Sequence, residues 1–163
     1  MKPDPSSRTR KALEVATVLA RWLLGALFLY MGLNKALHPV AFLKLLRQYE
    51  MLQSPMLLNS VAAVLPWFEV FCGLLLLAGV AVRGTALIVI LMLVPMTLMV
   101  LDRALALQAA QAILFCAVKF DCGCGAGEVF ICRKLFENCV LLTLSGWLLS
   151  GHGRKYCARY ALR

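Results

Sequence analysis

The stretch Gly84–Leu101, GTALIVILMLVPMTLMVL, runs for 18 residues without a charged side chain. A helix that crosses the hydrocarbon core of a bilayer needs roughly 20 mostly apolar residues, so this stretch predicts a membrane span. Three further runs of similar length contain at most one charged residue each: Val15–Leu33, Val61–Val82 and Asn138–Gly153. The four runs together predict a bundle of four membrane-spanning helices.

The composition of the whole chain agrees with a bilayer as its solvent. Of the 163 residues, 62% are hydrophobic and 15% are charged, and the mean hydropathy is +0.82. A soluble domain carries about a quarter of its residues as charged side chains. We therefore expect one all-α membrane domain over residues 1–163. The expected helices cover about 13–37, 60–82, 85–101 and 135–150, with outer loops at about 38–59 and 102–134.

The formal charge of +9 predicts an orientation in the membrane. Nine Lys and Arg residues lie in the two terminal tails and in the short turn at Arg83, and seven lie in the two longer loops. Because basic residues concentrate on the cytoplasmic side, we expect both termini in the cytoplasm and a multi-pass protein. The basic excess indicates topology and contact with lipid head groups, and we expect no nucleic-acid partner.

Three of the expected helices carry a stripe of small or polar residues at helical spacing. Such a stripe lets a neighbouring helix approach closely, so we expect each one to face the bundle interior. The stripes are Arg21, Gly25, Phe28, Gly32 and Lys35 on the first helix, Pro66, Glu69 and Gly73 on the second, and Cys132, Cys139 and Gly146 on the last.

Glu69 is the one acidic residue inside an apolar run. Ionisable side chains within a membrane usually face the bundle interior and find a partner there. Arg21 and Lys35 are the candidate partners, since both lie on the inward stripe of the first helix. A structural ion pair is the favoured interpretation, and a proton or ligand site is the alternative.

Three segments give the chain a family resemblance. The pattern R-x-x-x-G-x-x-F-x-x-x-G-x-x-K from Arg21 to Lys35 and the stretch LPWFEVFCGLLLLAG, Leu65–Gly79, resemble the DoxX/MauE group of four-helix bacterial membrane proteins. The DCGCG island, Asp121–Gly125, resembles the MauE branch in particular. The resemblance implies a location in the bacterial inner membrane. It also implies a role in maturing periplasmic disulfide-rich proteins beside a thioredoxin-like partner.

Four of the seven cysteines fall on the expected outer side, where disulfides can form. Cys122 and Cys124 are separated by Gly123, which permits the tight bend that their pairing requires. A disulfide in so small a ring is strained, and strained disulfides exchange readily. We predict that Cys122 and Cys124 form an exchange site and that Cys132 or Cys116 is the resolving thiol.

The remaining cysteines have other expected roles. Cys139 lies seven residues after Cys132, about 10 Å along a helix, which is too far for a disulfide between them. We expect apolar packing to keep Cys139 unreactive. Cys72 is expected to be a small packing residue, and Cys157 a reduced thiol in the cytoplasmic tail.

Other functions for the four outer cysteines stay open at this point. They could bind zinc or copper(I), although paired C-x-x-C spacing is absent and no metal site is expected. They could instead form a purely structural disulfide, or act in a thiol oxidase linked to quinone, the one cofactor that the sequence leaves open. The non-enzymatic alternative is a small accessory subunit of a larger respiratory or photosynthetic complex.

Overall fold

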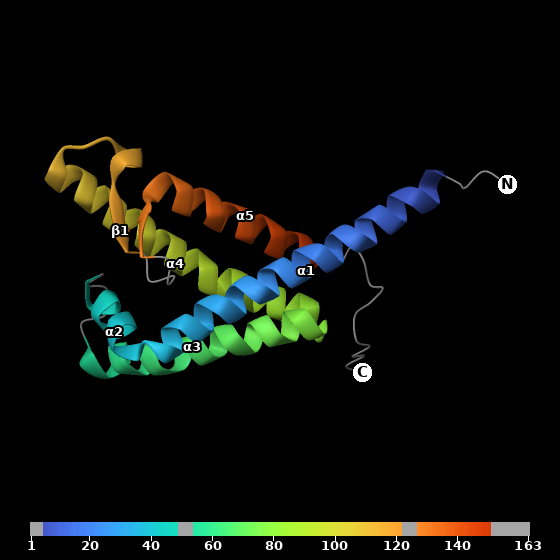
Figure 1. The fold of residues 1–163 in the computed structure, drawn as a ribbon, viewed down its shortest axis with the longest axis horizontal. Coiled ribbons are helices and arrows are strands. Elements are labelled where there is room, and N and C mark those ends of the chain that lie inside the picture. The colour runs from blue at the N-terminus through green and yellow to red at the C-terminus, as the bar shows by residue number, and fades with distance from the viewer. Residues whose placement is uncertain (1–4, 49–53, 122–126, 151–163) are drawn as a thin grey trace.

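The computed structural model describes residues 5–48, 54–121 and 127–150, and the chain there is mostly helical (Figure 1). The elements in chain order are α1 (Pro5–Leu37), α2 (Pro39–Gln48), α3 (Pro55–Ala78), α4 (Val82–Gln111), η1 (Phe115–Ala117), β1 (Lys119–Asp121), β2 (Glu128–Phe130) and α5 (Ile131–Ser150). Within the described residues, three helices are long and apolar enough to cross a membrane, namely Lys11–Leu37 of α1, α3 and α4. A membrane crossing by α5, the expected fourth span, stays a prediction.

The long helices form two tightly packed pairs. α1 packs along α3 and α4 packs along α5, whereas contacts between the two pairs are sparser (Figure 1). All four helices contribute to the main apolar core, which contains Leu24, Phe28, Leu76, Val89 and Leu148. Bulky side chains, including three tryptophans, are exposed on the outside of the bundle: Trp22, Leu23, Trp67, Phe68 and Trp147.

Glycines set the short distance between α1 and α3. A Cβ atom on Gly73 of α3 would lie 2.7 Å from the backbone nitrogen of Leu29 and 2.8 Å from the carbonyl oxygen of Gly25. No side chain fits at such a distance, so the two backbones touch here. Every residue of the predicted α1 stripe is buried, as are the three residues of the α3 stripe. Both predicted interior faces are confirmed.

The predicted end of the third helix at Asp102-Arg103 is wrong. α4 continues without a break to Gln111, so the first part of the outer loop expected at about 102–134 is helical. The continuation is rich in Ala, Leu and Gln, which favour helix strongly, and a charged pair alone does not interrupt a helix. Val100 and Ala104 are buried in a second apolar cluster with Ile131 at the start of α5.

The turn between α3 and α4 lies earlier than predicted. We expected it at Arg83, whereas α3 ends at Ala78 and is followed by Gly79, with a φ of 71°. Ala81, with a φ of 46°, precedes α4. The backbone N–H of Val80 donates to the Leu75 carbonyl at 3.0 Å, which closes the end of the helix. Gly79 provides the left-handed conformation that this closure needs.

The inward face of α5 also differs from the predicted one. Cys139 and Gly146 are exposed instead of facing the interior. The buried residues are Ile131, Lys134, Asn138, Leu141, Ser145 and Leu148. Small size alone suggested the wrong stripe. Polar side chains determine the inward face, because inside the bundle they find hydrogen-bond partners that lipid does not offer.

A short antiparallel hairpin, which the sequence did not predict, joins α4 to α5. Lys119 pairs with Phe130, and Asp121 pairs with Glu128. The Ile131 N–H donates to the Val118 carbonyl at 3.1 Å, so the start of α5 is attached to the hairpin. The hairpin lies at the same end of the bundle as α2 (Figure 1), a helix within the outer loop expected at about 38–59.

Candidate functional site

The buried pair Lys35–Glu69 connects α1 to α3 near the hairpin end of the bundle. The Lys35 ammonium lies 2.5 and 2.8 Å from the two carboxylate oxygens of Glu69, and both side chains are 6% exposed. The same ammonium lies 5.4 Å from the centroid of the Phe42 ring of α2. An ion pair with both charges so deeply buried stays stable only while each partner neutralises the other.

Arg21, the other candidate partner of Glu69, lies elsewhere. It is 14 residues before Lys35 on the same helix, about 21 Å along the axis. Its guanidinium lies against Gly79, at the turn between α3 and α4. Arg21 is also buried, with 5% of its surface exposed. The sequence therefore identified two inward cations, of which Lys35 is the partner of Glu69.

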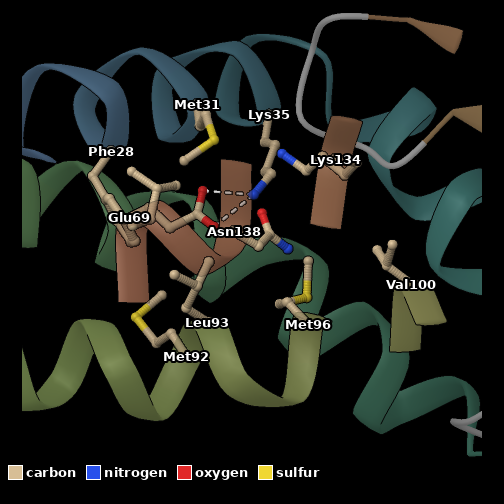
Figure 2. A pocket seen from close by; sticks show the side chains of 11 residues that line it. Phe28, Met31, Lys35, Glu69, Met92, Leu93, Met96, Val100, Lys134 and Asn138 are labelled. Atoms are coloured by element: carbon tan, nitrogen blue, oxygen red, sulfur yellow. Dashed lines mark hydrogen bonds and ion pairs between the residues drawn. The ribbon is translucent and has the colours of Figure 1, made fainter. Parts of the chain in front are cut away.

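A cavity of about 40 Å³ surrounds the ion pair at the centre of the four long helices (Figure 2). Its polar walls come from Lys35, Glu69, Lys134 and Asn138, and its apolar walls include Phe28, Met31, Met92, Leu93, Met96, Val100 and Leu141. One water molecule needs roughly 10–15 Å³ of such space. The cavity therefore has room for a few waters between the two helix pairs.

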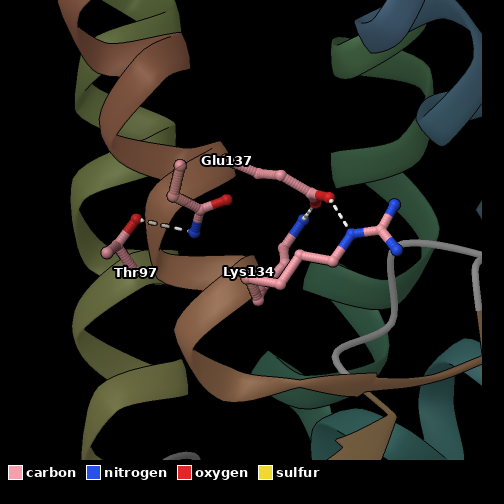
Figure 3. Close-up of polar contacts among 5 residues, drawn as sticks. Thr97, Lys134 and Glu137 are labelled. Atoms are coloured by element: carbon pink, nitrogen blue, oxygen red, sulfur yellow. Dashed lines mark hydrogen bonds and ion pairs between the residues drawn. The ribbon is translucent and has the colours of Figure 1, made fainter. Parts of the chain in front are cut away.

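Lys134 and Asn138 of α5 complete the polar cluster and were missed as site residues. The Asn138 side-chain amide donates to the Thr97 hydroxyl at 3.0 Å, and the Lys134 ammonium lies 3.8 Å from a Glu137 carboxylate oxygen (Figure 3). Both side chains are buried. Their spacing of four residues, which places them on one helix face, was the available signal.

A second cavity, of about 80 Å³, lies outside the ion pair toward the hairpin. Its lining includes Asn34, Lys35, His38, Phe42 and Asp121. Lys35 therefore borders both cavities and lies between the interior cluster and the hairpin. Asp121 is the last residue of β1 and directly precedes Cys122 in the sequence.

The hairpin is closed at its base by a disulfide between Cys116 and Cys132, whose Cα atoms are 5.1 Å apart. The structure thus joins the two candidate resolving cysteines to each other. The predicted exchange cysteines, Cys122 and Cys124, lie outside the described residues. The disulfide also prevents all four outer cysteines from acting together as thiolate metal ligands.

Charged residues of the hairpin define the electrostatics next to the predicted exchange segment. The Lys119 ammonium lies 4.3 Å from the centroid of the Phe130 ring, across the two strands. The carboxylates of Asp121 and Glu128 belong to the strand pair that borders residues 122–126. Lys119 thus has an aromatic partner. Negative charge from the two carboxylates opposes a thiolate nearby.

The other described cysteines are unpaired. Cys72 is buried with 1% of its surface exposed, in agreement with a packing residue, and Cys139 is exposed. Cys132 does not pair with Cys139, as predicted. The expectation that apolar packing encloses Cys139 is wrong, because its position on α5 faces outward. Cys157 lies outside the described residues.

These features define a helical membrane protein with a buried ion pair beneath a disulfide-closed hairpin. The chain belongs to the MauE family, since the family model described as "Methylamine utilisation protein MauE" matches residues 13–151. This membership agrees with the MauE resemblance of the DCGCG island, and it links the protein to methylamine utilisation. No curated protein and no solved structure matches the chain.

Proposed function

We propose that the protein exchanges thiols and disulfides with a thioredoxin-like partner or a maturing protein at the hairpin end of the bundle. The observation that carries the proposal is the Cys116–Cys132 disulfide, at the base of a hairpin whose connecting segment holds two further cysteines. Disulfides persist in oxidising compartments, which supports an outer location for this end of the bundle. The family's link to methylamine utilisation supplies the wider setting.

The proposed topology has four crossings, with both termini in the cytoplasm of a bacterial cell and the hairpin outside the inner membrane. α5 contains 20 residues, which span about 30 Å and match the hydrocarbon core. It packs along α4, which supports a parallel path through the bilayer. A fourth crossing places the N-terminus and the C-terminus on one side.

The proposed exchange starts with the Cys122 thiolate, which attacks one sulfur of the partner's disulfide, and the partner's other sulfur leaves as a thiolate. Cys124 then attacks the mixed disulfide, so the partner leaves as a dithiol and Cys122–Cys124 becomes a disulfide. Two electrons pass to the partner in this direction, and the reverse direction oxidises the partner. In the reverse direction the partner's dithiol reduces the Cys122–Cys124 disulfide to a dithiol. The Cys116–Cys132 disulfide can then accept these two electrons from the Cys122/Cys124 dithiol by the same chemistry, which restores the Cys122–Cys124 disulfide and leaves Cys116 and Cys132 as thiols.

The buried cluster supports a structural role for Lys35 and Glu69 in this function. The ion pair fixes α1 against α3 directly beneath the cavity that Asp121 borders. The interior cavity of about 40 Å³ suits water better than a quinone ring. We therefore favour exchange without a bound cofactor over a quinone-linked oxidase.

Trapping of mixed disulfides tests the proposal. Cys124→Ser leaves Cys122 able to attack and unable to resolve, so covalent adducts with a partner protein should accumulate on non-reducing gels. The double variant Cys122→Ser/Cys124→Ser should form none while the protein still inserts into the membrane. Cys139→Ser is the matched control, because Cys139 is a described thiol without a disulfide, and its adduct pattern should equal that of the wild type.

Two results would contradict the proposal. Adducts that form equally well through Cys139 would show that any accessible thiol reacts. If Cys124→Ser forms no adducts under oxidising or reducing conditions, the Cys116–Cys132 disulfide has only a structural role. Mass spectrometry of the native protein, with and without reductant, assigns the redox state of each cysteine in the same samples.

A further inference from the structure

A groove of about 370 Å³ runs between α1 and α5 on the outside of the bundle. Its apolar walls are formed by Leu23, Leu27 and Met31 of α1 and by Phe136, Val140 and Leu141 of α5. The groove exists because α1 and α5 belong to different helix pairs and pack less closely than the members of each pair. It opens on the surface that faces lipid once α1 crosses the membrane.

The groove runs in the direction of a lipid chain and covers part of its length, since one leaflet contributes about 15 Å of hydrocarbon. Along α1, the lining residues extend about 12 Å from Met31 to Leu23, away from the hairpin end. Along α5, they extend about 10 Å in the same direction, from Lys134 to Leu141. The end near Lys134 lies at the start of α5, close to the membrane surface. The other end extends toward the bilayer centre, as does an acyl chain of the leaflet on the hairpin side.

The charges at the upper end of the groove are unbalanced. Two cations share one acid there, because Glu137 accepts a hydrogen bond from Arg133 Nε at 3.0 Å and lies 3.8 Å from the Lys134 ammonium. The formal charges of Arg133, Lys134 and Glu137 sum to +1. Arg133 is 76% exposed, and a guanidinium carries five N–H donors, of which the Glu137 contact uses one.

We infer that this groove binds one anionic glycerophospholipid of the leaflet on the hairpin side. One acyl chain lies between α1 and α5, and the phosphate accepts hydrogen bonds from the Arg133 guanidinium, a geometry that suits arginine and phosphate. The net positive charge selects an anionic head group over a zwitterionic one. The lipid thus fills the gap between the two helix pairs beside the buried cluster. This inference does not depend on the proposed thiol exchange.

Native mass spectrometry of the full chain from nanodiscs containing equal phosphatidylglycerol and phosphatidylcholine tests the inference. We expect one phosphatidylglycerol to be retained preferentially. Val140→Trp fills the groove and should lower that retention by at least about fivefold, as expected from losing a contact of this kind. Val94→Trp is the matched control, since Val94 is 40% exposed against 39% for Val140 and lines none of the described cavities.

Two further variants separate the chain site from the head-group site. Leu27→Trp fills the groove from the α1 side and should repeat the effect of Val140→Trp. An effect that both variants share would not be due to local misfolding of α5. Arg133→Gln should abolish the preference for phosphatidylglycerol over phosphatidylcholine, whereas Arg47→Gln, at the end of α2, should preserve it. Equal retention of both lipids by the wild type, equal behaviour of Val140→Trp and Val94→Trp, or displacement of the lipid by added ubiquinone would overturn the inference.

Discussion

Gly32 of α1 lies directly against the backbone of α3 at Pro66. A Cβ atom on Gly32 would be 2.7 Å from the Pro66 carbonyl oxygen and 2.8 Å from the Val70 nitrogen. Lys35 follows Gly32 by three residues, and Glu69 follows Pro66 by three. The close approach of the two backbones therefore places the ammonium and the carboxylate side by side, so the ion pair depends on a glycine that carries no charge itself.

Gly32→Ala should destabilise the protein because backbone atoms, which cannot turn away as a side chain can, occupy the space of the new methyl group. We expect a loss of about 1–3 kcal/mol in the free energy of unfolding. Thermal unfolding in detergent measures it. Gly146→Ala is the control, since among the described residues no atom beyond the neighbouring backbone of α5 lies within 4 Å of its Cβ position, and it should be neutral or slightly stabilising. Equal effects of the two substitutions would contradict the close contact.

Glu69→Leu should destabilise the bundle by about 3–5 kcal/mol, because it leaves the Lys35 ammonium buried without its carboxylate. Glu69→Gln should cost less, since an amide oxygen still accepts a hydrogen bond from Lys35. Unfolding curves in detergent compare the two variants. If Glu69→Gln folds normally and yet abolishes adduct formation with the partner, the pair has a chemical role beyond structure.

The double variant Lys35→Met/Glu69→Leu tests whether the charges themselves are needed for stability. Replacing both members of a buried ion pair by apolar residues of similar size is often neutral or stabilising. We expect the double variant to recover most of the stability that Glu69→Leu loses, measured in the same unfolding assay. A double variant as unstable as Glu69→Leu would mean that the charges of Lys35 and Glu69 also stabilise the protein through other groups.

The Cys116–Cys132 link predicts a defined mass and stability change. The segment that contains both cysteines should be about two mass units lighter in the native protein than in the reduced protein. Cys116→Ser/Cys132→Ser should lower the free energy of unfolding by about 3 kcal/mol, as expected for a loop of this length. The matched control is Cys72→Ser/Cys139→Ser, which removes two cysteines without a disulfide. Rapid alkylation of both Cys116 and Cys132 in the unreduced native protein would contradict the link.

The proposed orientation is tested by cysteines introduced into a cysteine-free variant. A cysteine near Ser6 or at Gly153 should resist an impermeant thiol reagent in intact cells, because both tails are expected in the cytoplasm. A cysteine near Gln53 should react. Labelling of the tails from outside would reverse the orientation and remove the oxidising environment from the hairpin.

The presence of α1 and α3 and the contact between them could be predicted because they follow from local patterns. Gly25, Gly32 and Gly73 are small, periodic and placed on faces that also carry the charged residues. Spacing alone identified Glu69 and offered two cations for it. Choosing Lys35 over Arg21 required the register between α1 and α3, which depends on the contact between distant segments.

The α4–α5 half was harder to predict. Asp102-Arg103 resembles a helix end in sequence, yet the helix-favouring residues after it and the burial of Ala104 against α5 extend α4. The face of α5 depends on where Lys134 and Asn138 find partners, and Thr97 on α4 is 41 residues away from Asn138. Strands of three residues, such as β1, are too short to give a clear alternating pattern.

The two helix pairs are each contiguous in the sequence, and this arrangement has a consequence for assembly in the membrane. α1 and α3 are synthesised before α4 and α5, so the first pair can form while the second is still being made. Lys35 and Glu69 both belong to that first pair. We expect these two buried charges to neutralise each other early, so that α4 and α5 insert beside an ion pair that has already formed.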